Sequence, residues 1–151
     1  MRGNSAHALE CRKADMRAEI ERILNYFTKR PEVMALYIFG SFDTPFERAD
    51  SDIDIAVLVS NENKKELDIL KDEYYYASPS FSMRTIDIVT LNAAPTYLKH
   101  RILKTGRILI DKNPSLRKEF TARVVQEYFD YKPIEDLYFS KLKTRLVMPV
   151  S

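Results

Sequence analysis

A glycine–serine pair, followed after ten residues by two aspartates that open an apolar strand, constrains this chain more than any other feature. The apolar run Leu36–Phe39 leads into Gly40 and Ser41, and Asp52 and Asp54 begin the second apolar run. Side chains on a β-strand alternate between its faces, so the two aspartates share one face about 7 Å apart. The pattern predicts a polar site at the junction of two apolar strands.

The residue types at this site suit a divalent cation and a phosphate chain. Two carboxylates this close repel each other unless a cation lies between them. Mg²⁺ prefers oxygen ligands and usually takes one or two carboxylates together with substrate phosphates. Gly40 has no Cβ, so the backbone can approach a ligand closely or adopt an unusual φ. Ser41 offers a hydroxyl and a backbone N–H, and a helical turn starting there would favour triphosphate oxygens.

A third acid, Asp87, lies in the middle of another apolar strand, predicted over Met83–Leu91. A charge in such a strand is costly unless it is paired or bound to a metal. If this strand lies beside Asp52–Leu58, three carboxylates converge. Two can hold a metal ion, and the third can complete a second metal site or accept a proton from an attacking hydroxyl. The rival interpretation of Asp87 is a structural charge or an edge charge.

These features resemble the polymerase-β-type nucleotidyltransferase superfamily. Within it, the chain is similar to the minimal nucleotidyltransferases, the MntA-type antitoxins that are paired with HEPN-domain (HepT) toxins. The resemblance extends from Met16 to Leu146. The segments that carry it are Gly40-Ser41, Asp52-Ile53-Asp54, Ile86-Asp87-Ile88-Val89, Leu91–Pro95, Leu98–Leu103, Gly106–Leu109 and Arg123–Pro133.

The resemblance implies an α+β chain with the polymerase-β-like nucleotidyltransferase fold, in which a small mixed sheet has helices packed mainly on one face. It implies an Mg²⁺-dependent enzyme that transfers AMP from ATP to a tyrosine hydroxyl of a cognate HEPN ribonuclease toxin and neutralises it. The catalytic and metal-binding residues would be Asp52, Asp54 and Asp87, and Gly40 and Ser41 would bind the nucleotide. The partners would be ATP and the toxin, with room for a homodimer within the toxin complex.

One segment departs from the family pattern. Many relatives have a small-residue turn of Arg-Gly type after the glycine–serine pair, whereas Phe42–Arg48 contains no glycine and adds two acids. A second hypothesis is therefore a non-catalytic antitoxin that binds and occludes its toxin. A third is an antibiotic-type nucleotidyltransferase that modifies a small molecule. Such enzymes usually add a sizeable helical substrate domain, and only Pro114 to Leu146 is available for it here.

Composition favours a single domain over residues 15–148, preceded by a flexible segment over residues 1–14. Of the 151 residues, 45% are hydrophobic and 30% are charged, as expected for one globular core. A net charge of +2 is too small to indicate direct nucleic-acid binding. Cys11 is the only cysteine, which excludes an intramolecular disulfide and fits a reducing cytoplasm. No apolar run approaches the length of a membrane span.

Hydrophobic periodicity predicts the order of the elements. A strand over Asp52–Val59 is apolar on both faces, so it is expected at the centre of the sheet. Arg107–Asp111 is expected at an edge. The remaining predicted strands are Val33–Phe39 and Met83–Leu91, and the predicted helices lie at Met16–Phe27, after Asn61 through Tyr74, at Pro95–Thr105, and in two C-terminal segments around Leu116–Tyr128 and Ile134–Leu142.

A run of basic residues follows the third acid and comprises Lys99, His100, Arg101, Lys104 and Arg107. It can bind phosphates or an acidic partner, and a solvated helix face explains it equally well. His100 is not expected to act as a general base, because the three acids already supply that role.

Overall fold

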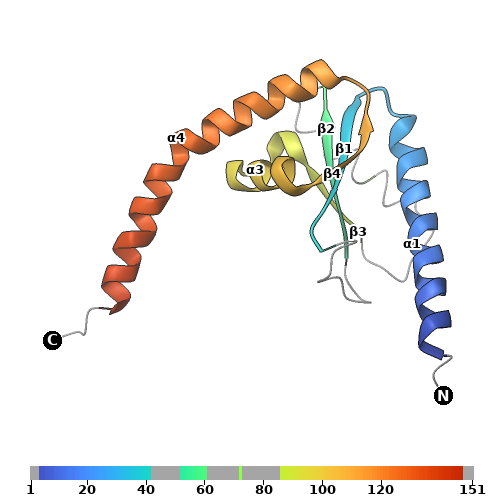
Figure 1. Ribbon diagram of the computed structural model, residues 1–151. Coiled ribbons are helices and arrows are strands. Elements are labelled where there is room, and N and C mark those ends of the chain that lie inside the picture. The colour runs from blue at the N-terminus through green and yellow to red at the C-terminus, as the bar shows by residue number, and fades with distance from the viewer. Residues whose placement is uncertain (1–3, 42–51, 61–71, 73–85, 148–151) are drawn as a thin grey trace.

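The computed structural model describes residues 4–41, 52–60, 72 and 86–147, and a four-stranded mixed sheet lies at its centre (Figure 1). The strands are β1 Val33–Phe39, β2 Ile53–Val59, β3 Ile86–Thr90 and β4 Arg107–Asp111. Their order is β3-β2-β1-β4. β2 is parallel to β3 and antiparallel to β1, and β1 is antiparallel to β4. The predictions of a central β2 and an edge position for β4 are confirmed.

Helices flank this sheet along the described part of the chain. They are α1 Asn4–Thr28, the 3-10 helix η1 Leu91–Ala93, α3 Thr96–Thr105 and α4 Pro114–Val147. α1 begins inside residues 1–14, and the flexibility of that segment and the domain limits 15–148 stay predictions. Apart from Asp72, which is helical, the helix expected after Asn61 lies outside the described residues, and so does the turn Phe42–Arg48. None of the described helices combines the length and the apolar character that a membrane crossing requires.

α1 covers one face of the sheet. Ile23 and Phe27, one helical turn apart, are buried against Leu36 of β1 and Ile55 of β2. Burying one such side chain fully contributes about 1.5–3 kcal/mol. The contact between this stripe of α1 and alternate strand residues therefore holds the helix to the sheet.

α3 and the first part of α4 cover the opposite face. Tyr37 and Leu58 point to this side and pack with Ile102 of α3 and with Phe120 and Val124 of α4. β1 and β2 are apolar on both faces and so require cover on both sides. The predicted packing on one face holds for α3 and α4, while α1 covers the other face.

A side chain extends the ladder between β2 and β3. Asn92 accepts a hydrogen bond from the N–H of Val59 at 3.0 Å and donates one to its carbonyl oxygen at 2.9 Å. The amide thus takes the place of a strand backbone just after β3 ends at Thr90. This pair of hydrogen bonds to the backbone fixes the chain at the end of β2 and supports the register that places Asp87 beside Asp54.

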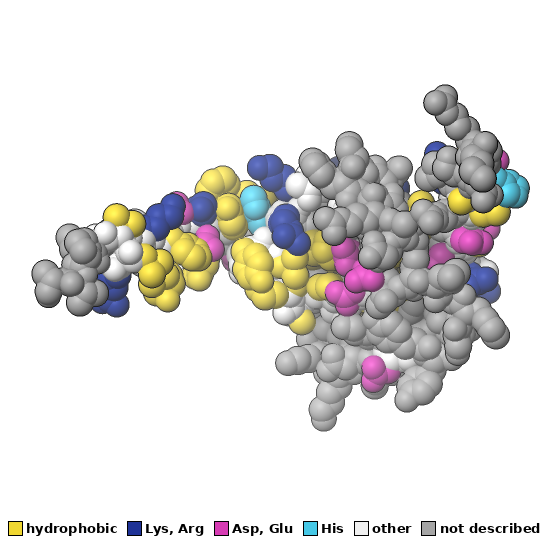
Figure 2. All heavy atoms as spheres, turned by 90° about the horizontal axis from the view of Figure 1, so that it is seen from below, with side chains coloured by type: hydrophobic (Ala, Val, Ile, Leu, Met, Phe, Trp, Pro, Cys, Tyr) yellow, Lys and Arg dark blue, Asp and Glu magenta, His cyan; other side chains and the backbone are white. Residues whose placement is uncertain are grey.

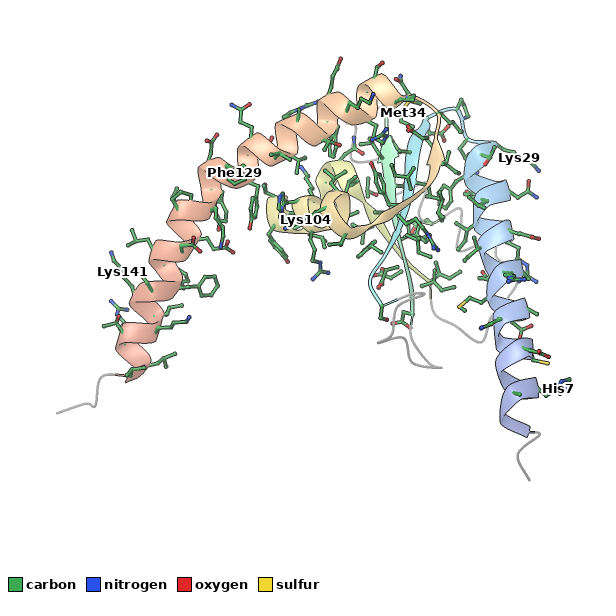
Figure 3. All side chains as sticks on the ribbon, in the orientation of Figure 1. His7, Lys29, Met34, Lys104, Phe129 and Lys141 are labelled. Atoms are coloured by element: carbon green, nitrogen blue, oxygen red, sulfur yellow. The ribbon has the colours of Figure 1, made fainter. Side chains whose placement is uncertain are left out.

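The C-terminal region differs from the predicted pair of helices. α4 is one helix of 34 residues that continues through Pro133. A proline inside a helix has no N–H to donate, and its ring crowds the carbonyl four residues earlier, here that of Phe129. Figure 1 shows α4 changing direction part-way along, and Figure 3 places Phe129 at this bend. The proline bends the helix without ending it, so the prediction of two separate helices is wrong.

Candidate active site

Three aspartates lie on one face of the sheet, at the end where β2 and β3 begin. Asp54 of β2 and Asp87 of β3 are direct neighbours in the parallel ladder, and adjacent strands lie about 4.8 Å apart. Asp52 precedes β2 by one residue and shares the face of Asp54 by alternation. Ile53 and Ile55 belong to the core under α1. The aspartates therefore lie on the opposite face, the one that α3 and α4 cover.

Gly40 allows the backbone to pass directly against Asp54. Its φ is +83°, in the left-handed region that glycine adopts without steric cost. A Cβ at this position would overlap Oδ2 of Asp54 and lie 3.2 Å from its Cγ. Phe39, the residue before it, pairs with Asp54 across β1 and β2. The sequence predicted an unusual φ or a close approach to a ligand here. The structure shows the unusual φ, and the close approach that it shows is to Asp54. Ser41 follows in a half-buried turn.

The three carboxylates influence one another electrostatically. Burial raises the pKa of Asp54 most, and the charges of Asp87 and then Asp52 raise it further. The guanidinium of Arg101 on α3 acts on the same pKa in the opposite direction. Asp54 is half-buried, whereas Asp52 and Asp87 are exposed. A cation placed among these groups would relieve their repulsion.

A match to a family sequence profile covers most of the chain and identifies its family. Residues 21–115 match the sequence profile described as polymerase beta, nucleotidyltransferase. The chain belongs to the polymerase β nucleotidyltransferase family. The matched region contains all four described strands and all three aspartates. No curated protein sequence matches this nucleotidyltransferase.

Solved structures share the fold of this nucleotidyltransferase. A chain from the crystal structure of a toxin–antitoxin with AMP-PNP has a TM-score of 0.68 and 22% identity, covering 82% of this chain and 97% of that one. A chain from the tri-AMPylated Shewanella oneidensis HEPN toxin in complex with MNT antitoxin has a TM-score of 0.60 and 20% identity, covering 87% and 98%. One from the toxin–antitoxin MntA–HepT has a TM-score of 0.59, with the same identity and coverage. At these identities the likeness establishes the α+β polymerase-β-like fold.

The donor atoms of the nucleotidyltransferase fit Mg²⁺. The ion prefers oxygen ligands, and the three side chains here are carboxylates. Within the described ranges, no three His, Cys, Asp or Glu side chains are close enough to hold an ion by themselves. Mg²⁺ between a protein and a triphosphate does not need three, because phosphate and water oxygens complete its coordination. Asp52 and Asp54 would hold the ion, with Asp87 completing a second site or acting as base, and these roles stay predictions.

The basic run of the sequence divides between the site and the contact of α3 with α4. The His100 ring stacks on Tyr128 of α4, with centroids 3.7 Å apart. Lys99 lies over another aromatic ring of α4, 5.8 Å from its centroid. Arg101 is the member whose charge acts on Asp54. The sequence grouped these residues with Lys104 of α3 and Arg107 of β4, because their spacing does not tell which of them acts on Asp54.

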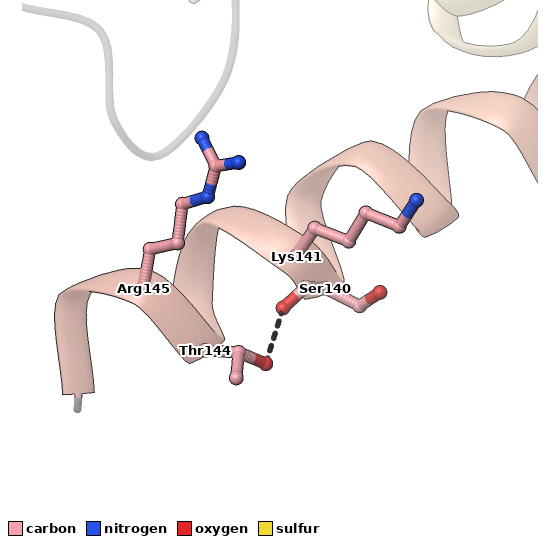
Figure 4. A pocket seen from close by; sticks show the side chains of 4 residues that line it. All are labelled: Ser140, Lys141, Thr144 and Arg145. Carbon is pink, nitrogen blue, oxygen red and sulfur yellow. Dashed lines mark hydrogen bonds between the residues drawn. The ribbon is translucent and has the colours of Figure 1, made fainter.

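A depression on α4 lies away from the aspartates. Ser140, Lys141, Thr144 and Arg145 line it, and the Thr144 hydroxyl donates a hydrogen bond to the Ser140 carbonyl at 2.9 Å (Figure 4). Figure 3 places Lys141 on the part of α4 that projects from the body. The lining comes from successive turns of a single helix and includes no carboxylate, so it adds nothing to the chemistry of the aspartates.

Proposed function

We propose that this protein is a cytoplasmic antitoxin that transfers AMP from ATP to a tyrosine hydroxyl of a HEPN-family toxin and thereby neutralises it. The family supports nucleotidyl transfer. Two structures of the same fold support ATP as the donor and a HEPN toxin as the acceptor, since one contains AMP-PNP and another a tri-AMPylated HEPN toxin. The observation that carries the proposal is the pairing of Asp54 with Asp87 in register, with Gly40 pressed against Asp54.

The transfer forms one bond and breaks one at the α-phosphorus of ATP. The acceptor oxygen attacks this phosphorus, and the bond to pyrophosphate breaks as the new phosphodiester forms. The hydroxyl proton passes to a carboxylate, for which the exposed Asp87 is the candidate. Ser41, next to Gly40, would contact the triphosphate, and Arg101 adds a positive charge on the α3 side. Bound Mg²⁺ supplies charge neutralisation for the phosphate oxygens.

Occlusion without transfer is the main competing function. Phe42–Arg48 lacks the glycine of the family turn and adds two acids near the expected triphosphate site. Extra negative charge there would weaken the nucleotide grip while leaving a binding surface intact. A small-molecule transferase is favoured less, because the available C-terminal residues form one extended helix, α4, and not a substrate domain.

Intact-mass spectrometry of a purified HEPN-family protein encoded beside this chain's gene tests the proposal. The protein is incubated with this chain, ATP and Mg²⁺, and the Asp52→Asn/Asp54→Asn protein serves as the control. We expect the HEPN-family protein to gain mass in whole AMP units. The gain should disappear when the tyrosine–AMP phosphodiester is hydrolysed, and it should be absent with the control. The substitutions preserve side-chain volume, so circular dichroism should show an unchanged fold.

The alternatives give different results in the same experiment. A tight complex without any mass gain would establish occlusion and overturn catalysis. Full transfer by the Asp52→Asn/Asp54→Asn protein would overturn the assignment of these aspartates. The absence of a HEPN-type neighbour, together with transfer to an antibiotic-type small molecule, would favour the third function.

A further inference from the structure

The second half of α4 leaves the body of the molecule and carries large apolar side chains into solvent. Val124 is 1% exposed, whereas Phe129 is 65% and Leu146 is 83% exposed. Figure 1 and Figure 3 show this part of α4 extending away from the sheet beyond the bend. Residues 129–147 are called the α4 arm below. Its exposed large apolar residues are Phe129, Tyr131, Ile134, Leu137, Tyr138, Phe139, Leu146 and Val147.

The apolar residues surround the α4 arm and do not form a single stripe. Successive residues of an α-helix are rotated by about 100°, so Ile134 and Tyr138 share one side. Leu137 and Phe139 then lie about 100° to either side of Tyr138, and Phe129 lies on the opposite side. Charged residues lie between them, but apolar side chains on several sides exceed the single stripe that an amphipathic surface helix has. A pair of arms from two copies would cover one stripe on each, so the arm fits better in a groove between several helices of another protein.

The α4 arm is not expected to be a stable helix by itself. Pro133 removes one of the internal hydrogen bonds, and only residues 134–147 follow it in the helix. Isolated helices shorter than about 15 residues are marginal in water. Patches of exposed apolar side chains on a monomer usually mark an interaction surface. Covering the arm would therefore both bury apolar area and hold the helix.

Charge is distributed unevenly along the α4 arm. Residues 140–147 contain Lys141, Lys143 and Arg145 and no acid, so the tip carries a formal charge of +3. Nearer the bend, Lys132 is bound to Asp136 at 2.6 Å. A partner groove that is acidic where it receives the tip would complement this distribution.

The position of the α4 arm relates it to the aspartates. Both belong to the side of the sheet that α3 and α4 cover. Figure 2 shows hydrophobic side chains along the arm and, on the same side of the molecule, further hydrophobic and then acidic side chains on the body. Tyr97 on α3, 56% exposed, adds an apolar side chain on the body. A partner bound along the arm would thus lie on the side of the molecule from which the aspartates are reached.

We propose that the α4 arm is the docking element for the protein acceptor, whose helices form an apolar groove with acidic residues at the end that receives the basic tip. This inference rests on the proposed function, because it assigns the binding energy that orients the acceptor hydroxyl. Asp52 and Asp87 are exposed, so the carboxylates themselves offer little to hold a protein. Binding energy gained at a remote surface can supply that orientation.

Two variants with the same spacing and the same new residues test the docking role. Ile134→Lys/Tyr138→Lys places two charges on one apolar side of the α4 arm. Ala122→Lys/Gln126→Lys places two lysines, also four residues apart, at exposed positions of α4 next to the body. Lysine is a good helix former, so both proteins should fold, which circular dichroism and urea unfolding would verify.

The readouts are AMP transfer to the purified HEPN-family protein, its binding by titration calorimetry, and ATP·Mg²⁺ binding by this chain alone. For Ile134→Lys/Tyr138→Lys we expect the KM for the acceptor to rise at least about tenfold, as for two lost anchor side chains. The kcat at saturating acceptor should fall as well, because the binding energy of the arm also orients the acceptor hydroxyl. The affinity for ATP·Mg²⁺ should stay unchanged. The Ala122→Lys/Gln126→Lys protein should match the unsubstituted chain in all three.

Other outcomes overturn the inference and separate it from the proposed function. An unchanged KM and unchanged acceptor binding would show that the α4 arm is not the docking element, even while transfer continues. A dimer of this chain in sedimentation that only Ile134→Lys/Tyr138→Lys abolishes, without loss of acceptor binding, would assign the arm to a second copy. If the unsubstituted chain transfers no AMP, the proposed function fails, and the calorimetric binding of the two variants still decides the role of the arm.

Discussion

Gly40 lies so close to Asp54 that a side chain at position 40 would displace the Asp54 carboxylate. The overlap of a Cβ with Oδ2 of Asp54 is direct, and the positive φ adds a separate cost for any L side chain. Gly40 therefore fixes the position of the Asp54 carboxylate, to which the proposed function assigns a metal-binding role. The approach of the Gly40 backbone to a phosphate stays a prediction.

Gly40→Ala should reduce AMP transfer far more than it reduces folding. The left-handed conformation of alanine costs roughly 1–2 kcal/mol of stability. A displacement of Asp54 by about 1 Å can lower the rate about a hundredfold. Urea unfolding and initial rates of transfer measure the two effects. Gly106→Ala is the matched control, since its Cβ would lie 2.5 Å from the Ile102 carbonyl oxygen, away from the carboxylates. Equal losses of rate in the two variants would contradict this role for Gly40.

The raised pKa of Asp54 predicts a pH dependence of stability in the absence of divalent cations. Burial, Asp87 and Asp52 favour the protonated form in the folded state, so the folded chain binds more protons than the unfolded chain above about pH 3.9. The free energy of unfolding should therefore fall as the pH rises through the window between that value and the raised pKa. Asp54→Asn should remove this fall and be the more stable protein at pH 7. Urea titrations at a series of values between about pH 3.5 and about pH 7.5 measure this, and parallel stability curves of the two proteins would contradict it.

At the scale of elements, the strands were predictable because their residues are apolar at every position that the sheet buries. Val33–Phe39 and Ile53–Val59 are covered on both faces, which leaves no alternative for such sequences. The end of β3 was harder to predict. The pattern continued it through Leu91, but the chain turns into η1 there, since Asn92 bonds to the backbone of Val59. Such a pairing over a separation of 33 residues leaves no local signal in the sequence.

α4 shows where local rules are insufficient. The apolar repeats around Leu116–Tyr128 and Ile134–Leu142 predicted two helices, yet one helix continues on both sides of Pro133. The residues after the bend have few neighbours to pack against, so nothing in the described core requires the chain to turn back. The direction of the α4 arm is consequently set by the bend at Phe129 and Pro133 alone.

Pro133→Ala should strengthen the α4 arm without strengthening the core. Alanine restores a donor to the Phe129 carbonyl and is favoured over proline by about 3 kcal/mol inside a helix. Because the buried residues of α4 end at Val124, the free energy of global unfolding should change little. Hydrogen exchange should slow for amides in residues 129–140, with unchanged exchange in β1 and β2. Faster exchange in the arm, or a large shift of global stability, would contradict this account.

At the scale of the whole molecule, the sequence predicted which residues form the candidate site, and the fold showed how they meet. Gly40, Ser41, Asp52 and Asp54 lie at the end of β1 and the start of β2, which are consecutive in the chain and antiparallel, so their spacing is a local signal. The approach of Asp87 depends on the parallel pairing of β3 with β2, which spacing alone does not determine. The action of Arg101 on Asp54 depends further on how α3 packs over the sheet.

Binding of ATP and Mg²⁺ together should stabilise the whole molecule, because the site joins β1, β2 and β3. At a concentration of about one hundred times its Kd, a ligand that binds only the folded state adds about 2.7 kcal/mol to the free energy of unfolding. Thermal unfolding with ATP and Mg²⁺ should show this gain, and ATP with EDTA should show much less, since the carboxylates repel an uncompensated triphosphate. Asp52→Asn/Asp54→Asn should lose most of the gain that depends on Mg²⁺. Equal stabilisation by ATP with and without the cation would place the nucleotide away from the aspartates, and the geometry of Gly40 and Asp54 would then need a structural explanation.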